Sequence, residues 1–525
     1  MRYGSGFIGT LSARVPGVFV GASVGLASFV LYLSTLAPTV LSRVPGEGLY
    51  DAGLFQVRAY MLSISHPTGY PTYLLLAKLF TYLPVGDVAY RVNLASAVFG
   101  AMAVFAVFVV CRQITGRMLP SAAAAALLAV SQTFWEQTVI AEVYTLHALF
   151  IAIVISVLLL WRKTRRDRYL LLWAFLVGLA MTNHMTSGLL LLVGLLFVRL
   201  TERGKLSDRR LTLKGAGLFV LGLTPYIYLP VRSLVDPPFA AYEPDTPMRF
   251  LAFVSGSPFS KNMLVFGPSE LLGRLEMYRV YLSQQFHWLF VLVAIVGLIS
   301  LFRRDRNVFT LLGLLYAGWL LYALEYNISD IWVYFIPTYL IICVLVAPGI
   351  VSLVEGTRFA LSALVPYSTL RAVPKALAIL VFLALLVPVV GSDGTYLTVD
   401  HSDSYEGRET IEAVAEDLEP GATVITDGSS IWYMKLVEER RRDLKLVSPF
   451  LENEFASGAP GHWLRFTKEH MDKNETVYIV APNGIGKKSS ILLKEKGYRL
   501  TPRKGSAYYE VRYSPNVPDQ NVKHV

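Results

Sequence analysis

Two side chains able to move protons stand close together early in the chain, in the stretch from residue 50 to residue 71. Asp51 offers a carboxylate, and His66 offers an imidazole between a serine and a proline. Carboxylates and imidazoles are the usual general bases of enzymes. The stretch follows the first long apolar run, Val15–Leu36, so it lies where a first membrane span would end. The sequence therefore predicts a general base, Asp51, at a membrane surface.

Other familiar catalytic signatures are absent from the sequence. It contains no Gly-x-Ser-x-Gly nucleophile elbow and no His-Glu-x-x-His zinc helix. The run 481–489 resembles a phosphate-binding loop, but Ala481 and Lys488 stand where that loop needs a glycine and a hydroxyl residue. Glu142 and His147 are five residues apart, a poor spacing for one helical face, and no Cys/His cluster suggests zinc. The sequence thus predicts no metal site.

The composition is that of a membrane protein. Of 525 residues, 54% are hydrophobic and 16% are charged, and the mean hydropathy is +0.48. Residues 1–391 hold the long apolar runs, with 30 Lys and Arg against 17 Asp and Glu, whereas residues 392–525 have the composition of a soluble domain, with 18 against 21. The net charge of +10 thus belongs to the membrane part, where loop charge explains it without nucleic acid. The two cysteines, Cys111 and Cys343, lie in apolar runs and indicate no disulfide framework.

Apolar runs long enough to cross a bilayer predict eleven membrane-spanning helices. They lie near residues 15–38, 91–111, 119–135, 142–161, 169–184, 187–200, 213–231, 286–302, 308–324, 331–354 and 374–391. Basic clusters fall in alternate loops, so the positive-inside rule places the N-terminus in the cytoplasm and the C-terminal domain outside. This assignment requires that residues 66–84 do not cross the bilayer, and we expect them to form an amphipathic or re-entrant helix on the outer surface.

This topology brings many polar residues to the outer ends of the spans. They are Asp51, His66, Arg91, Glu136, Glu142, His147, Asn183, His184, Arg232, Glu325 and Asp330. Charged residues beside a membrane span are costly and usually mark a site, so this gathering predicts a shared cavity that opens outward. Two outer loops, 39–90 and 232–285, border it. The second loop carries several arginines and Lys261, which suit a phosphate head group.

Residues 392–525 alternate apolar runs with helix-like segments. Strands are predicted at 422–426, 444–447 and 476–481, and helices at 430–442 and 489–497. This alternation predicts a small α/β domain packed on the outer face of the membrane part. The chain is therefore expected to be an α-helical multispanning membrane protein (residues 1–391) with a C-terminal extracytoplasmic α/β domain (residues 392–525).

Several motifs along the chain resemble one known family. They are Asp51-x-Gly53-x-Phe55-Gln56, His66-Pro67-x-Gly69-Tyr70-Pro71, Tyr90-Arg91-x-Asn93, Phe134-Trp135-x-Gln137-x-x-x-x-Glu142-Val143-Tyr144, Asn183-His184 and Tyr228-Leu229-Pro230-x-Arg232. Together they resemble the protein O-mannosyltransferase-like family (domain of unknown function 2723) of the GT-C glycosyltransferase superfamily. The resemblance covers essentially the whole chain. Ala52 and Leu54 depart from it, because family members often have a serine and a glutamate at these positions.

The resemblance implies a GT-C-like fold and an enzyme that transfers a sugar from a polyprenyl-phosphate carrier on the non-cytoplasmic face. Asp51 would deprotonate the acceptor hydroxyl in a single, inverting displacement. Arg232, Arg91 and Lys261 would hold the donor phosphate. Candidates for binding the sugar or the acceptor are His66, Tyr70, Glu142, His184, Asp330, Tyr334 and Trp135. No cofactor and no divalent metal are expected.

The expected partners are the lipid bilayer, a polyprenyl-phosphate-linked sugar and an acceptor. The family favours mannose transfer to protein Ser or Thr, with a glycolipid or surface polysaccharide as alternative acceptors. A polyprenyl-lipid transporter or flippase would also have an outward polar cavity, but it should show repeated halves, and no halves match. A non-catalytic assembly protein with a degenerate site is a further alternative, given Ala52 and Leu54. The expected location is the plasma membrane of a prokaryote.

Overall fold

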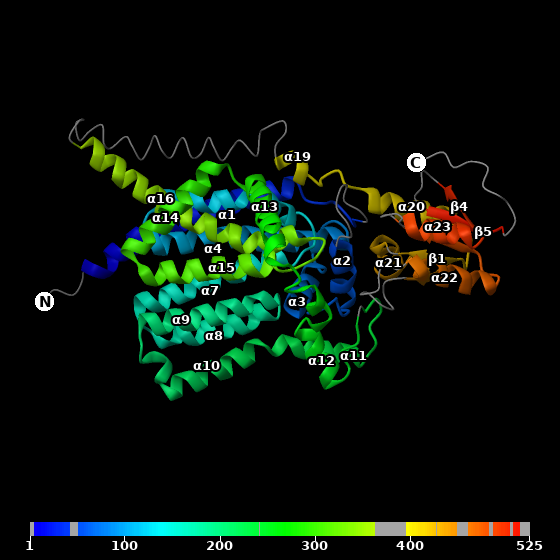
Figure 1. Ribbon diagram of the computed structural model, residues 1–525, viewed down its shortest axis with the longest axis horizontal. Helices are drawn as coiled ribbons and strands as arrows, with labels where there is room; N and C mark the ends of the chain where they lie inside the picture. The colour runs from blue at the N-terminus through cyan, green and yellow to red at the C-terminus, as the bar shows by residue number, and fades with distance from the viewer. Residues whose placement is uncertain are drawn as a thin grey trace.

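Two parts follow one another along the long axis of the molecule (Figure 1). The computed structural model describes residues 5–41, 51–240, 242–362, 395–426, 428–448, 460–481, 487–503 and 508–514. The first part is a bundle of long helices, and the second is a smaller domain that contains the five-stranded sheet. This arrangement confirms the predicted class, a multispanning helical part followed by an α/β domain.

Six helices among the described residues are long and apolar enough to cross a membrane. They are α1 (Ser5–Ser34), α4 (Val88–Thr115), α7 (Tyr144–Thr164), α10 (Arg209–Gly222) continued by α11 (Tyr228–Ser233), α15 (Arg306–Leu324) and α16 (Ile336–Leu361). Two bent pairs raise this to as many as eight: α5 (Met118–Ala129) with α6 (Gln132–Thr138), and α13 (Pro268–Gln285) with α14 (Trp288–Arg304). The predicted span 374–391 lies outside the described residues. The predicted number of eleven therefore stays a prediction.

The first outer loop forms two short helices, α2 (Asp51–Met61) and α3 (Pro71–Phe80). At 1.5 Å per residue, α3 extends about 15 Å, which is half the thickness of a bilayer's hydrocarbon core. Its end presents Leu79 and Tyr82 to the outside. These features agree with the expected surface helix over residues 66–84, which keeps the whole loop at one end of the bundle.

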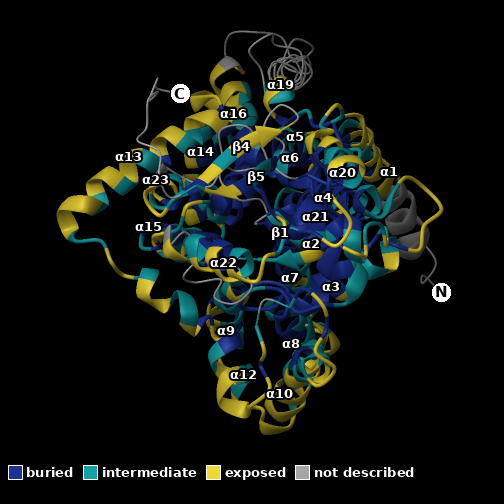
Figure 2. Cartoon of the chain, turned by 90° about the vertical axis from the view of Figure 1, so that its right-hand side faces the viewer, coloured by how far each residue is buried: buried dark blue, intermediate teal, exposed yellow. Residues whose placement is uncertain are grey.

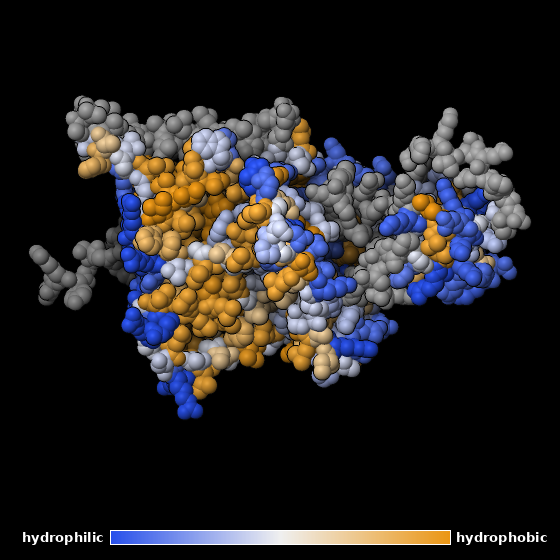
Figure 3. Space-filling view, viewed as in Figure 1, coloured by the Kyte–Doolittle hydropathy of each residue, from blue (hydrophilic) through white to orange (hydrophobic). Residues whose placement is uncertain are grey.

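The opposite end of the bundle carries the basic loops. Ion pairs tie neighbouring loops together there: Arg162 with Asp305 at 2.7 Å, Arg165 with Glu202 at 3.1 Å, and Lys205 with Asp167 at 2.6 Å. In Figure 3 an apolar (orange) surface covers the bundle, with a hydrophilic (blue) rim at the end away from the C-terminal domain. The basic loops and the C-terminal domain thus lie at opposite ends of the spans, as the positive-inside reasoning requires.

The C-terminal domain is built on a mixed sheet with the strand order β2-β1-β3-β5-β4. The parallel strands β1 (Thr423–Thr426), β2 (Lys445–Val447) and β3 (Val477–Val480) lie where strands are predicted. The antiparallel hairpin of β4 (Tyr498–Arg503) and β5 (Tyr508–Tyr513) is not among the predicted strands. The helices are α19 (Thr395–Val399), α20 (Glu406–Asp417), α21 (Ser429–Leu436), α22 (Pro460–Asp472) and α23 (Lys487–Glu495).

The predicted helix over residues 430–442 is too long. The helix α21 ends at Leu436, and the backbone then turns through Glu439 and Arg441, whose φ angles are 57° and 46°. A left-handed backbone cannot continue a right-handed helix, so the segment ends there. The side chain of Arg441 instead bonds the carbonyls that follow α20.

The C-terminal domain docks directly on α2, the helix that begins at Asp51. A Cβ on Gly53 would overlap Ser429 of α21, so the absence of a side chain allows the two helices to approach. Arg408 of α20 joins Asp87 at 2.9 Å and Glu438 at 2.5 Å. Figure 2 looks onto this end of the molecule and shows α2 and α21 buried (dark blue) at its centre. The domain is therefore fixed against the helix that carries the predicted base.

Candidate active site

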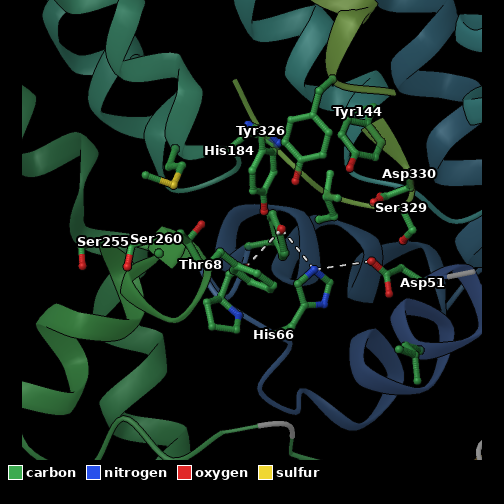
Figure 4. A pocket seen from close by; sticks show the side chains of 18 of the residues that line it. Asp51, His66, Thr68, Tyr144, His184, Ser255, Ser260, Tyr326, Ser329 and Asp330 are labelled. Atoms are coloured by element: carbon green, nitrogen blue, oxygen red, sulfur yellow. Dashed lines mark hydrogen bonds and ion pairs between the residues drawn. The ribbon is translucent and has the colours of Figure 1, made fainter. Parts of the chain in front are cut away.

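A cavity of about 520 Å³ opens at the junction of the two parts. Its walls come from α2, the loop between α2 and α3, the ends of α7 and of α8 (Asp167–Met181), the segments 255–263 and 322–334, and α21 of the C-terminal domain. Figure 4 shows Asp51, His66, Tyr144, Tyr326 and Asp330 around this space. Residues between Asp51 and Ser448 thus meet in one pocket, which agrees with the prediction of a shared cavity at the helix ends.

Asp51 is the first residue of α2 and lines this cavity. A carboxylate at a helix N-terminus is stabilised by the helix dipole and by free backbone N–H groups. Its side chain remains 36% exposed within the cavity, yet the surrounding protein removes much of its water. This burial raises the pKa of Asp51 to about 6, and the positive charge of Arg58 opposes the rise. The carboxylate is therefore more basic than a surface aspartate and still mainly ionised at neutral pH.

The motif that follows α2 places His66 against Asp51. The Nε2 atom of His66 lies 3.5 Å from Oδ2 of Asp51 and 3.1 Å from the hydroxyl of Tyr70. Gly69 has a φ of 89° and Tyr70 a φ of 46°, so the chain reverses and brings the two rings together edge to face. The Nδ1 atom of His66 lies 3.3 Å from the hydroxyl of Ser65. The motif is thus a turn that orients an imidazole toward the candidate base.

Arg58 is a cavity residue that the sequence analysis missed. It lies on α2 seven residues after Asp51, two helical turns away on the same face. Its side chain is buried, with Nη1 3.3 Å from the hydroxyl of Ser65 and Nε 3.4 Å from the carbonyl of Phe239. The spacing of seven between a carboxylate and an arginine was the signal in the sequence. Arg58 provides a fixed positive charge beside the carboxylate of Asp51.

The wall opposite α2 is rich in hydroxyl and carboxyl groups. It includes Asp330, whose pKa is raised to about 6, first by burial and then by the charge of Asp51. Tyr144, Tyr326 and Tyr334 lie beside it, and the ring of Tyr334 packs edge to face against the other two. His184 contributes an imidazole whose pKa is lowered to about 4, mainly by burial and also by His66. This wall offers uncharged donors and one carboxyl group, a combination that suits sugar hydroxyls.

His184 is held from behind by a chain of hydrogen-bonding groups. Its Nδ1 atom lies 2.8 Å from the hydroxyl of Thr186, which lies 3.2 Å from Nε2 of His147. The Nδ1 atom of His147 lies 3.1 Å from the hydroxyl of Ser187, and the two imidazoles stack at 4.5 Å. Trp319 donates its N–H to the carbonyl of Thr186. His184 therefore presents a fixed edge to the cavity.

The predicted phosphate-binding residues lie outside the cavity wall. Arg91 donates to the carbonyls of residues 81, 85 and 86 and fixes the turn before α4. Arg232 donates to the carbonyls of Leu62 and Met61 at the end of α2. Lys261 is exposed beside Ser260, which does line the cavity. The structure thus gives both arginines loop carbonyls as partners, and Arg58 takes the place beside Asp51.

Two predicted sugar-binding residues also lie behind the wall. Glu142 is buried, its backbone exchanges hydrogen bonds with Ser96, and burial followed by the charge of Asp51 raises its pKa. Trp135 is buried and donates its indole N–H to Thr35 at 3.0 Å. By contrast, the cavity wall includes the predicted residues His66, Tyr70, His184, Asp330 and Tyr334. Within the described part of the chain, no group of three metal-ligating side chains comes together.

Residues 51–207 match the family model described as the protein O-mannosyl-transferase TMEM260 N-terminal domain. The predicted family resemblance is confirmed for these residues. The protein O-mannosyl-transferase TMEM260 of Mus musculus is 31% identical over 218 residues, which are 40% of this chain and 30% of the mouse protein. The Dictyostelium discoideum protein of the same name is 19% identical over 295 residues, 52% of this chain and 36% of that protein. The matches therefore span about a third of the length of these relatives.

Solved structures confirm the GT-C-like fold. ArnT from Cupriavidus metallidurans, bound to undecaprenyl phosphate, aligns with a TM-score of 0.56 over 93% of this chain and 97% of its own, at 14% identity. The apo oligosaccharyltransferase of Archaeoglobus fulgidus aligns with a TM-score of 0.53 over 87% of this chain and 69% of its own, also at 14% identity. The membrane helices and the C-terminal domain therefore share one architecture with both proteins.

Proposed function

We propose that this chain is an inverting glycosyltransferase that moves a sugar, mannose favoured, from a polyprenyl-phosphate carrier to an acceptor hydroxyl, most readily a protein Ser or Thr. One observation carries the proposal: Asp51 and Arg58 stand on one face of α2 and line the same cavity. A base for the acceptor and a cation for the leaving phosphate are the two groups that this reaction needs. The likeness to proteins named protein O-mannosyl-transferase supports the same reaction.

Asp51 acts on the acceptor. A Ser or Thr hydroxyl must lose its proton as it attacks the sugar carbon, and a positioned carboxylate accelerates such a step by about 10²–10⁴-fold. The pKa of about 6 brings Asp51 closer to the pKa of a hydroxyl while leaving it ionised at neutral pH. His66, 3.5 Å from Oδ2, orients the carboxylate so that its other oxygen meets the acceptor.

Arg58 acts on the donor. The leaving group is a lipid phosphate, which needs charge stabilisation rather than protonation, and a guanidinium offers a fork of N–H donors to phosphate oxygens. Arg58 replaces Arg91 and Arg232 in this role because Arg58 lines the cavity together with Asp51, whereas the other two arginines lie outside the cavity wall. The undecaprenyl phosphate bound to ArnT, which shares this fold, supports a lipid phosphate as the carrier. No step of this proposal requires a metal ion.

The sugar occupies the wall formed by Asp330, His184 and the tyrosines. Their hydroxyl, carboxyl and imidazole groups match the alternating donors and acceptors of a hexose. A single displacement with Asp51 on the acceptor side inverts the configuration at the sugar carbon. The cavity lies at the end of the bundle that faces away from the basic loops, so the transfer takes place on the non-cytoplasmic side. As predicted from the sequence, we place the protein in a prokaryotic plasma membrane, with its N-terminus in the cytoplasm.

A transfer assay with defined donors tests this proposal. The purified full-length protein in nanodiscs is given radiolabelled polyprenyl phosphates carrying mannose, glucose or an aminosugar, with a Ser/Thr peptide, a glycolipid or a polysaccharide as acceptor. We expect transfer of mannose to the peptide with an inverted anomeric configuration. Radiolabel on the glycolipid or the polysaccharide would show that the acceptor is not a protein, while the transfer reaction itself would be supported. Movement of the intact donor across the membrane of reconstituted vesicles without transfer would overturn the reaction and indicate a flippase.

A further inference from the structure

Trp432 brings the C-terminal domain into the cavity. It lies on α21, lines the same space as Asp51, and packs against Phe239 with ring centroids 5.0 Å apart at an angle of 34°. The Phe239 ring in turn faces Arg58, whose Cζ atom lies 5.2 Å from the ring centroid. Arg58, Phe239 and Trp432 therefore form a row of three packed groups from three distant segments of the chain.

Phe239 contacts Arg58 twice, and its backbone is strained to do so. Its carbonyl accepts a hydrogen bond from Nε of Arg58 at 3.4 Å, while its ring faces the guanidinium. Its φ of 64° lies in the left-handed region, which a residue with a bulky side chain rarely adopts. Such a conformation persists where the surroundings hold it, and it clusters at functional sites. The buried ring of Phe239 belongs to the apolar cluster shared with the C-terminal domain.

The helix that carries Trp432 is anchored to the membrane part on either side of it. Before it, Ser429 lies against Gly53 of α2. After it, the hydroxyl of Tyr433 accepts a hydrogen bond from the backbone N–H of Ala89 at 3.0 Å. These contacts fix the position of the Trp432 indole relative to the guanidinium of Arg58, although the two side chains belong to different domains.

We propose that the C-terminal domain is a working part of the donor-phosphate site, in which Trp432 and Phe239 are positioning residues that hold the guanidinium of Arg58. The proposal rests on the proposed function and deepens it. An arginine side chain has many rotamers, and stacking on an aromatic ring restricts the guanidinium to one plane. A fixed plane matters here because a bidentate contact with phosphate oxygens depends on the direction of the N–H fork.

Loss of the indole should therefore weaken donor binding while the Asp51 side chain stays in place. In Trp432→Ala we expect a short-chain polyprenyl phosphate to bind about tenfold more weakly, as one lost aromatic contact would produce, and the kcat/KM for the lipid donor to fall by at least a similar factor. Trp432→Phe keeps an aromatic ring against Phe239 and should stay within about threefold of the wild type. Trp463→Phe, in the buried cluster on the other face of the sheet, is the matched control for effects on the domain's packing.

A double-mutant cycle separates positioning from a general structural effect. If Trp432 acts through Arg58, then Arg58→Lys combined with Trp432→Ala should bind the lipid phosphate no more weakly than Arg58→Lys alone. Independent effects that multiply in the double variant would overturn the proposal, as would wild-type binding by Trp432→Ala. The melting temperature of each full-length variant, measured in parallel, shows that the fold is retained.

The pH profile gives a second reading of the same contact. Among the described residues, the charged or titratable groups around the carboxylate of Asp51 are Arg58, His66, Tyr70, Tyr144, Asp330 and Glu142. Arg58 is the group that lowers the pKa of Asp51, so its displacement in Trp432→Ala should move the acid limb of the transfer rate to higher pH. An unchanged acid limb in Trp432→Ala would contradict the displacement of Arg58.

Failure of this inference can be told from failure of the proposed function. Binding of the lipid phosphate is measured without turnover. A wild-type protein that does not bind polyprenyl phosphate would overturn the proposed function itself. A wild-type protein that binds it, together with a Trp432→Ala variant that binds it equally well, would overturn only the role of the C-terminal domain.

Discussion

The dependence of transfer on pH follows directly from the surroundings of Asp51. Burial holds its pKa at about 6, against an ordinary value of 3.8. Only the ionised carboxylate can accept the proton of the acceptor hydroxyl, so activity should rise with pH through the pKa of the folded protein. We expect half of the maximal rate near pH 6 and a fall of about tenfold for each unit below about pH 5. An ordinary aspartate would still be about nine-tenths ionised at pH 5, so the two cases differ by about tenfold there.

The assay is the kcat/KM for a radiolabelled polyprenyl-phosphate sugar between about pH 4.5 and 8, with intrinsic fluorescence as the check that the protein stays folded. Asp330 is the matched control, because its pKa is also about 6 and the two carboxyl groups interact. Asp330→Asn should lower the rate but keep the acid limb. A wild-type kcat/KM that stays constant down to pH 5 would show that burial does not raise the pKa of the base. Loss of the acid limb of the pH profile in Asp330→Asn would indicate that Asp330, and not Asp51, is the base.

Three further variants test other parts of the site and fold. Thr186→Val removes the hydroxyl that joins His147 to His184, so the KM for the donor should rise about tenfold. The control variant Thr186→Ser keeps the hydroxyl and should have the wild-type KM, as measured by kinetics at varied donor concentration. Arg408→Gln breaks the partly buried ion pair with Asp87 that docks the C-terminal domain, so limited proteolysis should release that domain faster than in the wild type. Arg91 donates to loop carbonyls, so Arg91→Ala should lower the melting temperature by several degrees and leave the KM for the donor unchanged. A raised KM for the donor would indicate that Arg91 does bind the donor phosphate.

The sequence was sufficient to predict that Asp51 and His66 lie close together. Asp51 and His66 are close in the chain and separated by a short helix and a proline turn, so their proximity needed little information about the rest of the fold. Asp330 and His184 were predicted by a different argument, namely that charged or titratable groups at one end of several membrane spans converge on a cavity. The structure brings both to the cavity wall because the helix ends of a bundle necessarily meet at one surface.

The direction of individual side chains was not predictable. Arg91 and Arg58 both follow Asp51 within a few tens of residues, and the composition of this stretch does not distinguish them. Arg91 reaches back to carbonyls of its own turn, whereas the seven-residue spacing puts Arg58 on the face that carries the base. The spacing is therefore informative only once residues 51–58 are known to form one helix, which the residue types alone do not specify.

The C-terminal domain shows the same limit at a larger scale. The apolar strands β1 and β3 were predictable because they are buried on both faces. The strand β4 is mostly exposed and contains two arginines and a proline, so its pattern is not typical of a strand, and its pairing with β5 defines it. The place of Trp432 in the cavity depends on the docking of two domains and has no counterpart in local sequence.

The central claim is that Asp51 takes the acceptor proton during transfer from a polyprenyl-phosphate sugar. The most direct measurement is the single-turnover rate of transfer by Asp51→Asn under conditions in which binding of the donor is measured separately. We expect the variant to bind the lipid phosphate like the wild type and to transfer the sugar at least about 10²-fold more slowly. Asp51→Asn protein that binds the donor and transfers the sugar at the wild-type rate would contradict the claim.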